Sequence, residues 1–203
     1  MKIPELCRSL AVAFVLIALA ACATNPIAEW HDASFSGPVD NVLIIGATEQ
    51  STARRLFEDN FVEALAAINV RATASYRLMP VDQPITREAV EDAITDQSVD
   101  AVMVTRLLGV EGVDVYRPPT YHVHHRSYYR YYSHAMELSS PGYYERYKVL
   151  TLETNLYDTV SGQLVWSMQS ESFDPSTPDD VIRKQISLTI DTLDKRGLLD
   201  SAP

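Results

Sequence analysis

Residues 152–166 read LETNLYDTVSGQLVW. Two apolar segments flank residues 158–162, and this five-residue connection is typical of a hairpin turn because Gly162 can adopt the positive φ that such turns require. Apolar residues alternate with polar ones on both sides of the turn. These alternating residues are Leu150, Leu152, Leu156, Leu164, Trp166 and Met168. We therefore predict two antiparallel strands, the first of which spans residues 143–157.

Parallel structure is predicted on the N-terminal side of this hairpin. Val42-Leu43-Ile44-Ile45 is continuously apolar, as expected of a strand that is covered on both faces. A helix follows with Ser51 as its N-cap, and residues 70–78 then alternate as a second strand. Thr86 caps a second helix, and residues 101–108 form a third strand. This βαβαβ order favours parallel strands with right-handed crossovers.

The rest of the chain completes one domain. Residues 110–116 look like an extension of the third strand. Residues 177–180 (TPDD) begin a C-terminal helix, and Gly197 is expected to end it in a Schellman cap that joins Leu193 to Leu198. We predict the fold class α/β (α+β). It is a single domain of two or three layers, in which a mixed sheet of about five strands and three helices follow the order βαβαβ-ββα.

This predicted order resembles the α/β domains of several periplasmic lipoproteins. They are the penicillin-binding-protein activators, the curli-secretion lipoprotein and the N-terminal domain of the Tol-Pal translocation protein. The resemblance covers residues 39–199, and residues 152–158 with 162–166 look like the paired strands of uncharacterised lipoproteins of this type. It implies a fold more than a function, because one fold serves many functions. The activators reach through the cell wall on long tethers, whereas the tether expected here is short.

The N-terminal segment has the parts of a secretory signal. Lys2 and Arg8 supply positive charge, and residues 10–20 form an apolar run that is too short to span a bilayer as a helix. Leu19-Ala20-Ala21-Cys22 then resembles the lipobox of bacterial lipoproteins, in which an aliphatic residue and two small residues precede a cysteine. An ordinary signal peptide with an accidental cysteine is the alternative.

The lipobox resemblance implies how the chain is divided and where it resides. Residues 1–21 would be removed as a signal peptide, and Cys22 would carry diacylglycerol and usually an amide-linked acyl chain such as palmitate. Residues 22–38 would form a lipidated tether, and residues 39–203 an α/β periplasmic domain. The equal alternative for the tether segment is that Ile27 and Trp30 pack onto the domain. Ala23 stands where an Asp favours inner-membrane retention, so the resemblance implies a lipid-anchored protein on the periplasmic face of the outer membrane.

The cysteine count and the net charge argue against disulfides and against a nucleic-acid partner. If the lipobox resemblance holds, Cys7 would leave with the leader and Cys22 would be taken by lipid, so the mature domain would have no cysteine for a disulfide. The chain has 17 basic and 27 acidic residues, and without residues 1–21 the balance is 15 to 26, a net charge of −11. We therefore expect no nucleic-acid partner, because phosphate binding depends on Lys and Arg.

Catalytic motifs are not found in the sequence. It contains no G-x-S-x-G, H-E-x-x-H or C-x-x-C, and no phosphate-binding glycine loop. Gly46-Ala47-Thr48 has a single glycine and no following Lys, which is typical of an ordinary βα turn. The acidic pairs Glu91-Asp92 and Asp179-Asp180 are expected on solvated helix surfaces. We therefore predict a protein that is not an enzyme and needs no cofactor.

The unusual segment is a Tyr/His-rich loop at residues 117–142, which is longer than ordinary connections. The candidate partner or membrane contacts are Tyr121, Arg126, Tyr128, Tyr129, Arg130, Tyr131 and Tyr132. The candidate metal ligands are His122, His124, His125 and His134. Tyr and Arg are enriched both in interface hot spots and near lipid headgroups, and imidazoles bind Zn or Cu. A polar aromatic loop with no dedicated ligand is the fourth interpretation.

Together these observations predict an envelope lipoprotein that works as a non-enzymatic binding or scaffolding module. The membrane would be one partner, through the N-terminal lipid, and an envelope protein or the cell wall another. The alternative is a periplasmic metal-binding lipoprotein that uses the loop histidines.

Overall fold

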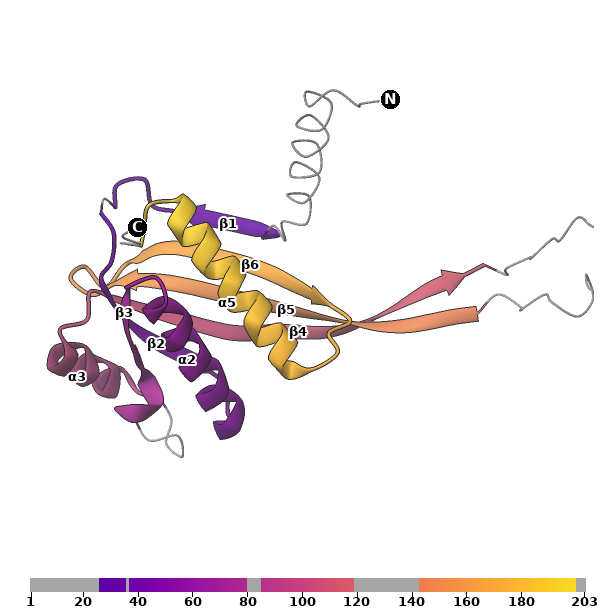
Figure 1. The fold of residues 1–203 in the computed structure, drawn as a ribbon, viewed down its shortest axis with the longest axis horizontal. Coiled ribbons are helices and arrows are strands. Elements are labelled where there is room, and N and C mark those ends of the chain that lie inside the picture. The colour runs from indigo at the N-terminus through magenta and orange to yellow at the C-terminus, as the bar shows by residue number, and fades with distance from the viewer. Residues whose placement is uncertain (1–25, 36, 80–84, 119–142, 200–203) are drawn as a thin grey trace, which may run out of the picture.

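The computed structural model describes residues 26–35, 37–79, 85–118 and 143–199 (Figure 1). Six strands form one mixed sheet in the order β1-β6-β5-β4-β2-β3. The strands are β1 (Ala28–His31), β2 (Asn41–Ala47), β3 (Arg71–Ala74), β4 (Ala101–Arg117), β5 (Tyr143–Asp158) and β6 (Leu164–Phe173). The helices are α2 (Ser51–Ala66), α3 (Arg87–Gln97) and α5 (Pro178–Lys195), with a short 3-10 helix η1 (Ser75–Arg77). The predicted α/β (α+β) class is confirmed.

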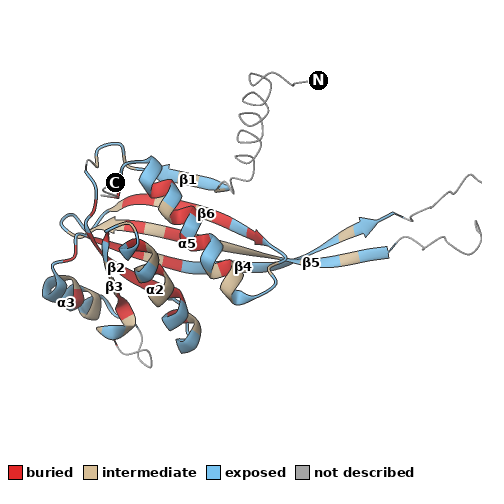
Figure 2. Cartoon of the chain, in the orientation of Figure 1, coloured by how far each residue is buried: buried red, intermediate tan, exposed pale blue. Residues whose placement is uncertain are grey.

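Helices cover the two faces of the sheet unequally. Helices α2 and α5 lie side by side on one face, where Phe61 and Leu193 are fully buried against Trp166 of β6. On the other face, α3 packs through Ala93 on Leu43 of β2 and its neighbours. Figure 2 shows that buried residues concentrate under α2 and α5. The larger core therefore lies on the α2/α5 side.

Sheet pairing follows the predicted division of the chain. Strand β2 pairs in parallel with β3 and with β4, as the βαβαβ order requires. Strands β4, β5 and β6 pair antiparallel. At the β5–β6 turn, Gly162 has φ +68°, and the Ser161 amide donates to Oδ2 of Asp158 at 2.7 Å. The hairpin predicted from residues 152–166 is confirmed.

Three of the four predicted helix caps are present. Thr86 and Thr177 each accept a backbone amide three residues later, at 3.2 Å. Gly197 has φ +66°, and the Leu198 amide donates to the Leu193 carbonyl at 3.0 Å, which is the hydrogen bond of a Schellman cap. The prediction of Ser51 as an N-cap is wrong. The preceding residue occupies that position without a side-chain hydrogen bond, and Ser51 is the first helical residue.

The strand predicted over residues 70–78 is too long. Strand β3 ends at Ala74, and the chain turns into η1. The reason is Glu58 of α2, whose carboxylate accepts the Ser75 hydroxyl at 2.6 Å and the Tyr76 amide at 2.8 Å. Both groups are directed towards the helix, so the alternating pattern does not continue as a strand.

The sixth strand lies within the segment that was predicted to be a tether, residues 22–38. Strand β1 pairs antiparallel with β6, from Ala28 opposite Gln169 to His31 opposite Trp166. The tether interpretation is therefore wrong for residues 28–31, and the alternative, in which this segment packs onto the domain, is correct there. The physical reason is that the backbone groups along one edge of β6 would have no strand partner without β1. A strand of four residues is long enough to pair with them.

Candidate functional site: an exposed β-ribbon arm

Strands β4 and β5 continue beyond the rest of the sheet as a two-stranded ribbon (Figure 1). Pairing of β4 with β2 ends at Arg106, and pairing of β5 with β6 ends at Val149. Residues 112–117 and 143–148, which we call the arm, form strand pairs only with each other, and at the base of the arm the Lys148 carbonyl also accepts the Asp174 amide. A register shift between Leu107 and Gly109 lies where β4 leaves β2. Both edges of the arm therefore carry backbone groups that no described strand pairs.

Tyrosine rings are exposed on the arm, none of whose residues is buried (Figure 2). The exposed fractions of Tyr116, Tyr143 and Tyr144 are 51%, 57% and 73%. Tyr116 and Tyr144 face each other across the two strands, with ring centroids 5.2 Å apart. Such a cross-strand aromatic pair stabilises a ribbon by about 0.2–1 kcal/mol. It also leaves most of both rings open to a partner.

The other face of the arm carries a polar cluster around Tyr147. The Arg117 guanidinium donates to Oε2 of Glu145 at 2.9 Å and to the Tyr147 hydroxyl at 2.6 Å. Hydrogen bonds from Tyr147 and then Arg117 lower the pKa of Glu145, while the bond to Glu145 raises the pKa of Tyr147. The Tyr147 ring lies 5.0 Å from Phe173 of β6, which is 55% exposed. This cluster fixes the arm to the body of the sheet.

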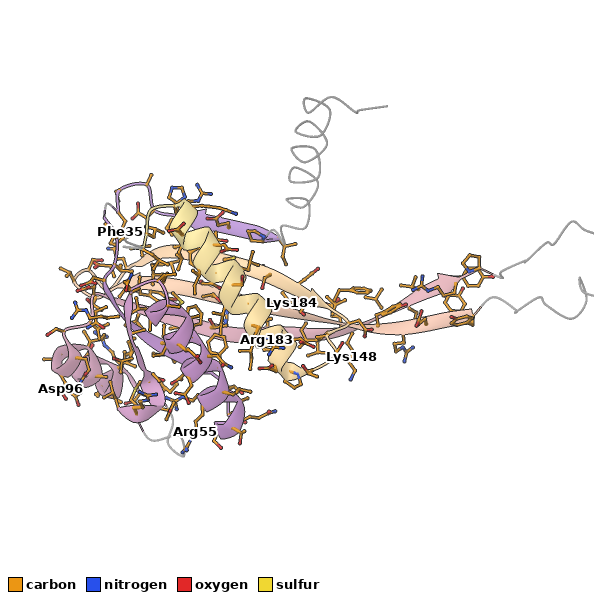
Figure 3. All side chains as sticks on the ribbon, viewed as in Figure 1. Phe35, Arg55, Asp96, Lys148, Arg183 and Lys184 are labelled. Carbon is orange, nitrogen blue, oxygen red and sulfur yellow. The ribbon has the colours of Figure 1, made fainter. Side chains whose placement is uncertain are left out.

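A second ion pair joins the strands of the arm. Arg146 donates from Nε and Nη2 to both carboxylate oxygens of Asp114, at 2.7 and 2.9 Å. These hydrogen bonds lower the pKa of Asp114 and raise that of Arg146. Figure 3 shows side chains leaving the arm on both sides, with Lys148 at its base. The arm thus combines both signs of charge with exposed rings, a combination that suits binding more than catalysis.

Apolar side chains are also exposed where the arm begins. Leu107, Leu108, Val110 and Val113 of β4 are 51%, 41%, 56% and 39% exposed. Val110, opposite Leu150, lies on the face of Tyr116 and Tyr144, whereas Val113 lies with Tyr147 and Phe173 on the other face. An isolated two-stranded ribbon is only marginally stable in water. Exposed apolar side chains on such a ribbon are typical of a surface that binds a partner.

The residues predicted as sites from the sequence lie outside the described residues. This applies to the candidate contacts Tyr121, Arg126, Tyr128, Tyr129, Arg130, Tyr131 and Tyr132. It applies equally to the candidate ligands His122, His124, His125 and His134, and to the lipidation site Cys22. The arm leads directly into this segment, because Arg117 and Tyr143 form its last described pair. The structure therefore places the two ends of the Tyr/His-rich loop at the tip of the arm.

A buried polar network was not predicted. Arg54 and Glu58 of α2 are 2% and 0% exposed, and their side chains meet at 3.0 Å. Glu58 also accepts the Gly46 amide at 2.9 Å, the Ser75 hydroxyl and the Tyr76 amide. Because both carboxylate oxygens are occupied by neighbouring donors, the network fixes α2 to β2 and η1 and presents no free group for chemistry. The i,i+4 spacing of Arg and Glu is more typical of a helix surface, and no signal in the sequence separates the two cases.

The described part of the chain has neither a cluster of metal-ligating side chains nor a helix that could span a membrane. Within residues 26–35, 37–79, 85–118 and 143–199, no group of three or more His, Cys, Asp or Glu side chains is placed to hold a metal ion. None of the helices in this described part combines the length and apolar character needed to cross a bilayer.

Comparison with known proteins gives only distant similarity. No family model matches the sequence, and no curated protein matches it. Among solved structures, the PelC L103M dodecamer from Paraburkholderia phytofirmans is 13% identical, with a TM-score of 0.46 over 86% of this chain and 97% of that one. Lipoprotein GNA1162 from Neisseria meningitidis is 9% identical, with a TM-score of 0.41 over 76% and 98%. A minor lipoprotein from Acinetobacter baumannii is 7% identical, with a TM-score of 0.27 over 78% and 89%.

Bacterial lipoproteins are thus among the similar structures. With identities of 13% or less and TM-scores below 0.5, this likeness carries no information about function.

Proposed function

We propose that this protein is a bacterial envelope lipoprotein that binds a partner through the β4–β5 arm and the Tyr/His/Arg segment between its strands. It acts as a non-enzymatic binding or scaffolding module without a cofactor. Its partner is another envelope protein or the cell wall. Acyl chains on Cys22 hold it on the periplasmic face of the outer membrane.

The observation that carries the proposal is the exposed surface of the arm. Tyr and Arg are enriched in binding hot spots, where rings become buried and guanidinium groups find carboxylates. Tyr144 is 73% exposed, yet it is held in place by Tyr116, so it can be buried by a partner with little loss of conformational freedom. The unpaired edges of the arm also offer main-chain hydrogen bonds to an added strand.

Site-specific photocrosslinking in intact cells tests this proposal. A photoreactive amino acid replaces Tyr144 on the arm, and a matched variant carries it at Val160, which is 93% exposed in the β5–β6 turn. We expect a specific adduct from position 144 and none from position 160. The same adducts from both positions, or none from position 144, would contradict a binding role for the arm.

The anchor is tested separately by metabolic labelling with a radioactive fatty acid. The wild type should incorporate label, and Cys22→Ser should not, because the substitution removes the attachment site. Equal lack of label in both proteins would rule out lipidation and leave the binding role of the arm untouched.

A further inference from the structure

The edge strand β1 lies close in sequence to the proposed lipid at Cys22. The β1 segment is fixed to the domain at both ends, because the Ile27 amide donates to the Gln169 carbonyl and the Asp32 amide to the Val165 carbonyl, both at 2.9 Å. A tether that starts at Cys22 can therefore extend no further than Ile27.

A side-chain latch also holds this strand. Glu29 accepts the Trp166 indole N–H at 3.1 Å and two hydrogen bonds from the Arg196 guanidinium at 2.8 and 3.0 Å. The Arg196 bond is the main cause of the lowered pKa of Glu29. Arg196, at the C-terminal end of α5, neutralises the charge of Glu29. The part of β1 around Glu29 therefore carries little net charge.

The length of the free chain limits how far β1 can move from the membrane. Five residue steps separate Cys22 from Ile27, and a fully extended chain spans at most about 17 Å over that length. If the free tether ran to Val39, the limit would be about 58 Å. The docking of β1 thus holds the edge of the sheet within a short distance of the acyl chains.

Two large apolar side chains are exposed on this edge. Ile27 is 55% exposed and Trp30 is 50% exposed. Tryptophan prefers the membrane interface, where the ring contacts the apolar boundary and the indole N–H stays hydrated. An edge strand suits the headgroup region more than the hydrocarbon core, because its outer backbone groups need hydrogen-bond partners that water and headgroups supply.

We propose that the outer edge of β1, with Ile27 and Trp30, rests in the headgroup region of the bilayer that holds the Cys22 lipid. This inference depends on lipidation of Cys22, which is part of the proposed function, and it adds the orientation of the domain on the membrane. The net charge of −11 opposes binding to an anionic surface, so the contact depends on the anchor, which keeps the edge at high local concentration. In this orientation the β1 edge of the sheet faces the membrane, and the strands run parallel to the membrane surface.

Tryptophan fluorescence provides a direct test, because the chain has only two tryptophans and Trp166 is 0% exposed. The full lipidated protein is reconstituted into vesicles of phosphatidylethanolamine and phosphatidylglycerol whose acyl chains carry bromine near the glycerol. We expect brominated lipid to quench a large part of the emission of the wild type. In Trp30→Phe this quenching should fall to the low level of Trp166 alone, while the unfolding midpoint stays unchanged.

Vesicle flotation and acyl labelling are measured on the same samples, so failure of the anchor can be told apart from failure of the contact. If the protein carries label and floats, yet bromolipid quenches wild type and Trp30→Phe equally, the membrane contact is wrong. If Trp30 is protected from acrylamide in vesicles without bromolipid quenching, a second copy or another protein covers the edge, which also overturns the proposal.

Discussion

Removal of the buried charge of Glu58 should strongly destabilise the domain. In Glu58→Gln, the Arg54 guanidinium, 2% exposed, loses its anionic partner, and the new side-chain amide competes with the donors that now point at the carboxylate. Breaking a buried ion pair by removing one partner costs about 3–5 kcal/mol. A domain of this size has an unfolding free energy of about 5–15 kcal/mol, so the variant should lose a large fraction of its stability and unfold at a much lower urea concentration.

The chain offers a matched control on its surface. Arg87 and Glu91 of α3 have the same residue types and the same i,i+4 spacing, but their side chains are 84% and 55% exposed. Glu91→Gln should leave the urea midpoint unchanged, because water solvates both groups. If Glu58→Gln and Glu91→Gln gave the same midpoint, the burial of the first pair would have no energetic consequence and the reasoning would be refuted.

Four further outcomes are expected. Gly197→Val should lower the unfolding free energy by about 1 kcal/mol or more, because φ is +66° there, and an unchanged urea midpoint would contradict this. Replacing residues 122–140 with a Gly-Ser turn should leave a cooperative transition within about 1 kcal/mol of wild type, since closure entropy changes slowly with loop length; an unfolded product would assign the loop to the core. Calorimetry at micromolar Zn²⁺ or Cu²⁺ should show no binding, whereas submicromolar affinity that is lost in His124→Ala with His125→Ala would favour the metal-binding alternative. Glu29→Gln should be less stable than wild type at pH 7. Because the folded-state pKa of Glu29 is lowered, this difference should shrink as the pH falls below the ordinary Glu pKa of about 4.3 and vanish below the lowered folded-state pKa, and a difference that persisted at still lower pH would exclude the latch.

Much of the fold was predictable because local chemistry and tertiary packing agree. The turn at Gly162, the Schellman cap at Gly197 and the parallel β2 strand each follow from a strong local signal. The prediction failed where a side chain far away in sequence decides the outcome. Glu58 ends β3 early by holding Ser75, and no pattern within residues 70–78 contains that information.

The candidate site was predictable only in part. The concentration of tyrosines near residues 117–142 indicated a surface segment, and the structure shows that its flanks form an exposed arm. Packing of Ile27 and Trp30 onto the domain was one of two interpretations, but the strand β1 itself was not predicted, because four residues carry too little periodicity to be recognised as a strand. Its partner strand begins more than 130 residues later, so only the assembled sheet reveals it.

The contacts that hold β1 also set a sequence of events for the folding chain. Glu29 meets Trp166 and Arg196 across separations of 137 and 167 residues, and Val39 bridges to Leu199. Forming a contact of such long range closes a long loop, which has a large entropic cost. Such contacts form late unless other structure already holds the two ends together. Because β6 and α5 must exist before β1 can dock, β1 should be the last strand to join the sheet, although it is the first in the sequence.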